Sequence, residues 1–168
     1  MINFTAILQK FDSKLWSHHI VVPQEIAIKF ISGTDRRVVC TLNDCISFQC
    51  ALMPLNDNSS FININKKIRD QLRIHEGSTV QVRLEKDMSQ YGLPLPEELS
   101  ALFEIDEEGK NLFHELTPGK QRTLLYIAGT GKNEETRIRK AIILIEHLKT
   151  QKGKIDFKLL YEALKLPK

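Results

Sequence analysis

The first basic group that could bind an anion lies near the middle of the chain. Lys66, Arg69 and Arg73 are spaced at i, i+3 and i+7, which places them on one face of a helix. Three cations on one face can receive a carboxylate or a phosphate group. The same pattern also suits a solvated face whose charge is partly offset by Asp70, and both interpretations stay open.

A second basic group follows the start of a later predicted helix. Arg137 and Lys140 share a face of this helix, whereas Arg139 points elsewhere. The positive end of the helix adds to their field and would favour an anion or a partner. Ion pairs with Glu134, Glu135 and the acidic stretch 97–108 are the alternative.

The segment Gly129-Thr130-Gly131-Lys132-Asn133 resembles part of a phosphate-binding loop. Such a loop needs a glycine five residues before the Gly-Lys pair and a hydroxyl directly after it. Tyr126 and Asn133 occupy those two positions, and no strand precedes the segment. We therefore expect a turn between helices here and no nucleotide.

Metal, disulfide and nucleophile motifs give no positive sign of a catalytic centre. His18 and His19 are adjacent on a strand and face opposite ways, and the other histidines are scattered. Cys40, Cys45 and Cys50 lack the close pairing of metal sites and are expected to be reduced. We expect no catalytic residues, no metal and no cofactor, although triads assembled from distant residues leave an enzyme open.

Trp16 is the single tryptophan of the chain. Facing outward, it would mark a contact surface for a partner. The alternative is that it fills the core, as large apolar side chains commonly do.

The charge is unevenly distributed along the 168 residues. Residues 88–116 carry one Lys against 7 Asp and Glu, whereas residues 117–168 carry 12 Lys and Arg against 5 Asp and Glu. The two segments could neutralise each other by docking, or the basic one could meet an external anion such as nucleic acid or a membrane surface. No apolar run approaches the ~18 residues of a membrane span, so we expect no integral membrane protein.

The elements that position these groups change type near the middle of the chain. Alternating or β-branched runs predict six strands, and the alternation of residues 79–87 is the clearest. The predicted strands span residues 3–12, 14–22, 36–42, 46–53, 60–64 and 79–87. Short helices are expected after Pro23, ending at Gly33, and from Asn65 to Leu72.

After residue 88 the pattern is helical throughout. Helices are predicted from Pro96, from Thr117-Pro118 to about Ala128, from Asn133 to Gly153 and over the last residues. In the third of these, the spacing of Ile138, Ile142, Ile145 and Leu148 predicts one buried face. Strands followed by helices indicate the α+β class, with a small barrel first.

Several stretches resemble a bacterial domain of unknown function whose members form a double-split β-barrel capped by helices, the class of AbrB-like regulators. They are Lys14-Leu15-Trp16 leading to Val21-Val22-Pro23, residues 63–69, Glu76-Gly77 before residues 80–85, and residues 95–99. Residues 116–122 and 135–142 resemble the bacteriocin-protection family, also called YdeI/OmpD-associated. Asp44 stands where the resemblance expects a hairpin glycine, but it tolerates a tight turn.

We therefore expect a barrel domain over residues 1–90, an acidic helical connector over 91–116 and a basic helical domain over 117–168. The resemblance and the missing catalytic motifs favour a cytoplasmic, non-enzymatic binding or stress-protection protein with an anionic ligand or a protein partner. Nucleic-acid binding is the alternative, and an enzyme with a site between barrel and helices is a lesser one.

Overall fold

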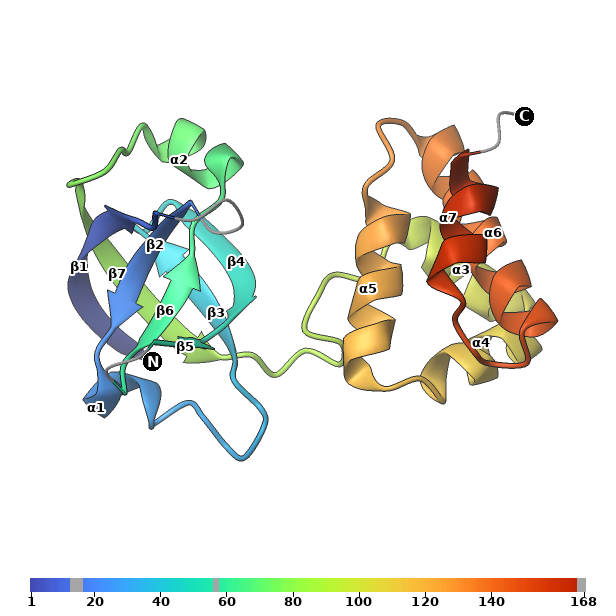
Figure 1. The fold of residues 1–168 in the computed structure, drawn as a ribbon, viewed down its shortest axis with the longest axis horizontal. Helices are drawn as coiled ribbons and strands as arrows, with labels where there is room; N and C mark the ends of the chain where they lie inside the picture. Colours follow the sequence, from blue (N-terminus) through green and yellow to red (C-terminus); the bar gives the residue numbers. More distant parts are fainter. Residues whose placement is uncertain (13–16, 56–57, 166–168) are drawn as a thin grey trace. The chain divides into compact units, whose positions relative to one another are not determined.

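The computed structural model describes residues 1–12, 17–55 and 58–165, so the prediction for Trp16 lies outside the described residues. The chain divides into two compact units, Met1–Met88 and Ser89–Lys168. Strands make up most of the first unit, and the second consists of helices, as the α+β prediction requires (Figure 1).

The first unit is a curled antiparallel sheet of seven strands. They follow one another in the order β4-β3-β7-β1-β2-β6-β5. Their bounds are β1 Ile2–Lys10, β2 His18–Val22, β3 Arg37–Leu42, β4 Ile46–Ala51, β5 Met53–Pro54, β6 Ser60–Asn63 and β7 Thr79–Lys86. Since β4 and β5 are the two edges of this order, the described strands form a half-barrel, and the double-split class stays a prediction.

Alternation along the strands explains why the sheet has a buried inner face. Val80, Val82 and Leu84 of β7 are at most 1% exposed, as predicted from their period of two. They join side chains such as Leu8 and Ile20 in one apolar core inside the curl. A change of one residue in register would bring the polar neighbours inward, so the register is strongly specified.

Local chemistry determines the turns and the short helices of this unit. Asn43 and Asp44 have φ of 50° and 52° in the β3–β4 hairpin, which confirms the predicted tight turn. Helix α2, Lys66–Leu72, begins after Asn65, whose side chain accepts a hydrogen bond from the Ile68 N–H. Figure 1 shows α2 at one end of the half-barrel and α1, Gln24–Ala27, at the other.

Two expectations for this unit were wrong in detail. The predicted strand 46–53 is broken at Leu52, and Met53–Pro54 pairs with β6 instead of β3. Leu52 is fully buried, and its side chain joins the core at the point where the chain changes partner. The helix after Pro23 ends at Ala27, before Gly33, whose φ of 57° serves a later turn.

The second unit contains five helices in the described residues. They are α3 Glu97–Ile105, α4 Glu107–His114, α5 Pro118–Gly129, α6 Glu134–Thr150 and α7 Phe157–Lys165. The helix predicted from Pro96 divides at Asp106, whose side chain caps α4 by accepting from the Gly109 N–H. None of the described helices has both the length and the apolarity that crossing a bilayer requires.

The face that α6 buries agrees with the prediction at Ile145 and Leu148 and differs at the other two positions. Its buried residues are Ala141, Leu144, Ile145 and Leu148. Ile138 and Ile142 are instead 41% and 44% exposed. Helices α3, α4, α5 and α7 all contact α6, whose buried residues form the side that packs against them. Ile138 and Ile142 lie at the edge of that buried side. An apolar row therefore remains on the surface of this unit.

Candidate binding groove

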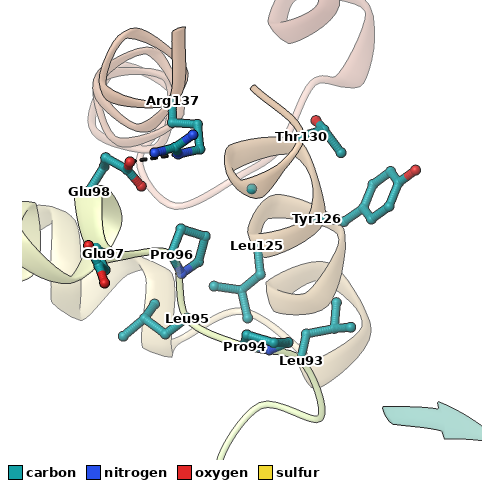
Figure 2. Close-up of a pocket in the computed structure, with 11 residues that line it drawn as sticks. Leu93, Pro94, Leu95, Pro96, Glu97, Glu98, Leu125, Tyr126, Thr130 and Arg137 are labelled. Atoms are coloured by element: carbon teal, nitrogen blue, oxygen red, sulfur yellow. Dashed lines mark hydrogen bonds and ion pairs between the residues drawn. The ribbon is translucent and has the colours of Figure 1, made fainter. Parts of the chain in front are cut away.

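A groove of about 630 Å³ opens in the helical unit between residues 93–96 and the second half of α5. Leu93, Leu95 and Leu125 provide apolar walls, and Tyr126, which is 67% exposed, lies at the outer side (Figure 2). Pro94 and Pro96 keep the 93–96 segment out of a helix, because a proline restricts the residue before it to extended conformations. The groove can accept an apolar side chain of a ligand.

A charged pair marks one end of the groove. Arg137 of α6 donates from Nε to Glu98 Oε1 of α3 at 2.6 Å (Figure 2). The Glu98 side chain is only 10% exposed and that of Arg137 is 32% exposed. The backbone N–H of Glu98 and the Arg137 guanidinium lower the pKa of the Glu98 carboxyl, against the opposing effect of burial. The Glu98 carboxylate is therefore ionised, and it is paired with Arg137.

The groove continues beyond this pair along α3 and α6. A second concavity of about 470 Å³ also includes Glu97, Glu98 and Arg137 and extends to Ile105 and Ile138. A third, of about 270 Å³, shares Ile138 and reaches Ile142. Neighbouring concavities thus share lining residues, and we refer to the three together as the helical groove.

The helical groove is apolar along its walls and acidic overall. Its lining contains four carboxylates and two guanidinium groups: Glu97, Glu98, Glu134, Glu135, Arg137 and Arg139. A carboxylate next to an apolar wall suits a ligand with a positive group beside apolar side chains.

Comparison with known families agrees with the division into two units. Residues 93–151 match the family described as bacteriocin-protection, YdeI or OmpD-associated. Residues 4–84 match a domain of unknown function, DUF1905. The chain thus contains a segment similar to DUF1905, followed by a segment similar to the bacteriocin-protection family. These matches confirm the resemblance to both families, with one correction: residues 95–99, which we compared above with the first domain, lie within the bacteriocin-protection match. No curated protein and no solved structure matches the chain.

Every residue that lines the helical groove lies within the bacteriocin-protection segment. The matched residues include α3 to α6, so the groove lies in the part of the chain that is similar to this family, and α7 does not line it. Sequence reasoning missed the groove, because Leu93, Leu125 and Ile138 carry no signal beyond apolarity. The exposed position of Ile138 follows only from packing.

The three cations predicted on α6 have separate partners. Arg137 pairs with Glu98, as described above. Arg139 Nη2 donates to the carbonyl oxygens of Ala163 and Leu164 at 3.5 and 3.4 Å, and Lys140 Nζ donates to Thr130 Oγ1 at 3.0 Å. Arg137 and Thr130 both line the groove. An anion bound by all three cations stays a prediction.

Two ion pairs join the acidic and the basic stretches of the helical unit, as the docking alternative described. They are Glu98–Arg137 and Asp106–Lys149, at 2.6 and 2.8 Å. The Gly129-Thr130-Gly131 turn has a packing role, because a side chain at Gly131 would come within 2.5 Å of Arg137 Cγ. This turn joins two helices, as expected.

The group predicted on α2 is only partly supported by contacts. Arg69 Nη1 contacts His18 Nδ1 of β2, whereas Lys66 is exposed and Arg73 ends the helix with φ of 53°. His18 and His19 face opposite ways, as neighbours on a strand do. His18 contacts Arg69, whereas His19 is buried and stacks on Phe11 with ring centroids 3.6 Å apart. His18 is the partner that sequence reasoning missed, since it lies 51 residues before Arg69 in the chain.

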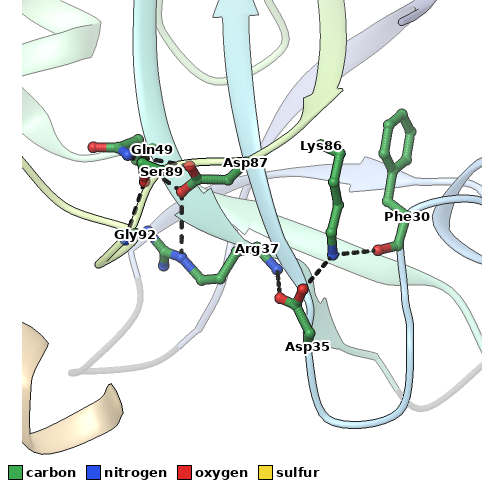
Figure 3. Close-up of polar contacts among 8 residues, drawn as sticks. All are labelled: Phe30, Asp35, Arg37, Gln49, Lys86, Asp87, Ser89 and Gly92. Atoms are coloured by element: carbon green, nitrogen blue, oxygen red, sulfur yellow. Dashed lines mark hydrogen bonds and ion pairs between the residues drawn. The ribbon is translucent and has the colours of Figure 1, made fainter.

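Another polar cluster lies at the end of β7 (Figure 3). The Gln49 amide donates to both carboxylate oxygens of Asp87 at 3.3 Å, and Arg37 lies 3.9 Å from Asp87. Lys86 pairs with Asp35 at 2.6 Å and also donates to the Phe30 carbonyl. These contacts connect the strand ends to the loop that follows α1, which gives the cluster a structural role. Within the described residues, no three potential metal ligands come together.

Proposed function

We propose that this protein binds an amphipathic, positively charged peptide in the helical groove and carries out no chemical step on it. The observation that carries the proposal is the row of three adjoining concavities, with exposed isoleucines and four carboxylates in their lining. Helix-in-groove recognition uses this combination, with apolar anchors at i, i+3, i+4 and i+7 of the ligand.

The apolar part of the binding free energy would come from side chains that are now in water. Ile105 is 82% exposed, and Ile138 and Ile142 form an i, i+4 row on α6. Fully burying an isoleucine side chain is favourable by about 1.5–3 kcal/mol. Because an apolar surface of this kind is a common mark of an interaction site, the row supports a partner instead of a purely solvated face.

The electrostatic part would come from the carboxylates. Glu97 and Glu134 lie in the first turns of α3 and α6, beside the Glu98–Arg137 pair. A positive side chain of the ligand could contact them without breaking that pair. The description of the matched family as bacteriocin-protection supports a peptide ligand. We extend the proposal to a cytoplasmic protein, because Cys40, Cys45 and Cys50 are all free thiols. The similarity to the bacteriocin-protection family supports a bacterial one.

The test uses the full chain and a fluorescently labelled synthetic peptide of about 18 Lys and Leu residues with helical spacing, as in an amphipathic helix. Anisotropy should show saturable binding that weakens as salt is raised. We expect Ile138→Ser combined with Ile142→Ser to weaken it about tenfold or more, a loss of about 1.4 kcal/mol. Glu97→Gln should reduce the dependence on salt.

The matched control is Ile28→Ser, which removes an isoleucine that is 61% exposed in the sheet unit. It should leave the affinity unchanged. The proposal is wrong if the peptide does not bind at low salt. It is also wrong if Ile28→Ser weakens binding as much as the double variant of Ile138 and Ile142 does.

Nucleic-acid binding remains the second candidate, and it is supported by the charge of residues 117–168. Two of those cations already have carboxylate partners: Arg137 pairs with Glu98, and Lys149 lies within 2.8 Å of both Asp106 and Glu146. We therefore favour the peptide. An oligonucleotide titration at low salt distinguishes the two. Nucleic-acid binding requires saturable binding of the oligonucleotide with an affinity that falls steeply as salt is raised.

A further inference from the structure

Three basic groups meet at the α2 end of the half-barrel, in a place separate from the helical groove. Lys10 of β1 and His18 of β2 are directly paired across the two antiparallel strands. Side chains of such a pair lie on the same face, with Cβ atoms about 4.5–5.5 Å apart. Arg69 of α2 contacts His18 through Nη1. Two strands and a helix therefore bring a lysine, a histidine and an arginine together.

The chain path explains why Arg69 reaches His18. Strand β6 pairs with β2, and the N–H of Ile64 donates to the His18 carbonyl at 2.8 Å directly after β6 ends. Asn65 then caps α2, so Arg69 lies one turn inside the helix, beside the first residue of β2. The position of Arg69 is thus determined by the pairing of β6 with β2 and by the Asn65 cap of α2, which fix the backbone on both sides of the contact.

The positive charge at this place lacks a direct counter-ion. An ion pair requires a nitrogen-to-oxygen distance of at most 4.0 Å. Among the described residues, no carboxylate oxygen lies this close to a side-chain nitrogen of Lys10 or Arg69. Partial burial of His18, together with Arg69 and Lys10, lowers the pKa of its imidazole, and Glu76 opposes this effect. The imidazole is therefore neutral at pH 7.

The tautomer of His18 follows from its contacts. Arg69 is always a donor, and Ser17 Oγ lies 2.6 Å from the same Nδ1 atom. Nδ1 is therefore the acceptor, and the ring proton is on Nε2. The guanidinium of Arg69 has five N–H donors, of which this contact uses one. The cluster thus has an excess of donors and of positive charge.

We propose that Lys10, His18 and Arg69 form a binding site for a small, doubly charged oxyanion such as a phosphate group. Its oxygens would accept from Arg69 and from Lys10, and charge-assisted hydrogen bonds of this kind are the strong ones. In binding the anion, Arg69 would turn from Nδ1 of His18 to the anion oxygens, and the nearby negative charge would then favour protonation of the freed Nδ1. This site goes beyond the proposed peptide groove and does not depend on it.

The experiment is a titration of the full chain with inorganic phosphate, followed by NMR of the histidine side chains. Sodium chloride at matched ionic strength is the reference. We expect the His18 signals to shift saturably and the pKa of His18 to rise by about 1 in phosphate. Arg69→Gln should weaken phosphate binding about tenfold or more, because a hydrogen bond to a charged group is lost.

Lys29→Gln is the matched control, because it removes one exposed positive charge after α1, at the other end of the half-barrel. It should bind phosphate as the unaltered chain does. Lys10→Gln provides a second variant if Arg69→Gln does not fold, since Lys10 is exposed at the end of β1, and it should weaken binding in the same way.

The proposal is overturned if phosphate changes the His18 signals no more than chloride does, or if the Lys10 and Arg69 variants retain the affinity. Besides the phosphate titration and its chloride reference, a third titration uses an oligonucleotide without a terminal phosphate. Tighter binding of this chain than of inorganic phosphate, lost in Arg69→Gln and steeply dependent on salt, would assign the cluster to a nucleic-acid backbone and also refute the single-anion site.

Discussion

At the scale of single residues, the absence of a side chain at Gly131 is as important as the charges around it. A Cβ atom there would lie 2.5 Å from Arg137 Cγ and 2.9 Å from the Arg137 backbone nitrogen. No adjustment of a flexible chain end relieves a contact with backbone. Gly131 therefore lets α6 start close to the turn, and this places Arg137 against Glu98.

We predict that Gly131→Ala destabilises the helical unit by about 1–3 kcal/mol, as overpacking commonly does. Urea denaturation followed by circular dichroism measures this change. Gly119→Ala is the matched control, because nothing lies within 4 Å of its Cβ position and alanine favours the first turn of α5. An unchanged or increased stability of Gly131→Ala would contradict the role given to this glycine.

At the scale of elements, the attachment of α7 depends on a histidine of α6. His147 Nε2 accepts a hydrogen bond from the Asp156 N–H at 3.1 Å. Asp156 Oδ1 accepts in turn from the N–H groups of Lys158 and Leu159 at the start of α7. Burial lowers the pKa of His147, and Asp156 opposes this effect. The neutral ring is therefore the form that holds the helix start.

We predict that α7 loosens as the pH falls. Because the folded pKa of His147 lies below its unfolded value of 6.5, its contribution to stability is complete above pH 6.5 and is lost as the pH falls through the folded value. Amide hydrogen exchange of residues 157–165, corrected for intrinsic rates, should be faster at pH 5 than at pH 7.5.

His147→Gln is the matched variant, because its amide oxygen can accept the Asp156 hydrogen bond but does not titrate in this range. It should abolish the difference between the two pH values in α7. If the variant keeps the full pH effect, His147 does not control this helix.

At the scale of the whole molecule, each compact unit has its own apolar core. The core of the sheet unit includes Leu42, Ile62 and Leu84, and that of the helical unit includes Phe113 and Leu144. Within the described residues, the two buried clusters contain no residue in common. A unit with a core of this kind can in principle fold as a domain.

We predict that Leu84→Ala lowers the stability of the sheet unit by about 2–5 kcal/mol, the usual cost of emptying a buried leucine site. The helical unit should keep its stability. Residue-resolved NMR in increasing urea separates the two transitions, with Val82 and Leu125 as reporters. Leu144→Ala should produce the reverse pattern, and transitions that move together in both variants would show that the units unfold as one.

The sequence by itself determined the features that a few neighbouring residues decide. Helices α2 and α6 begin after Asn65 and Asn133 as predicted, and both side chains accept a hydrogen bond from an N–H three residues later. Helix α5 also begins after Thr117 as predicted, but the Thr117 side chain makes no capping hydrogen bond. The alternation of β7 and the Asn43-Asp44 turn are local in the same sense. The strand-to-helix order, and with it the α+β class, follows from such patterns.

Only the tertiary structure decided which surfaces face each other. Ile138 and Ile142 have core spacing but lie at the flank of α6, because neighbouring helices pack against a different side. Arg69 contacts His18 of β2 and does not act with the other cations of its own helix. Strand pairing brings Arg69 and His18 together, although they lie 51 positions apart in the sequence. Periodicity specifies that a helix or strand has a face. Packing between distant segments decides what covers that face, and the candidate sites of this protein depend on the second choice.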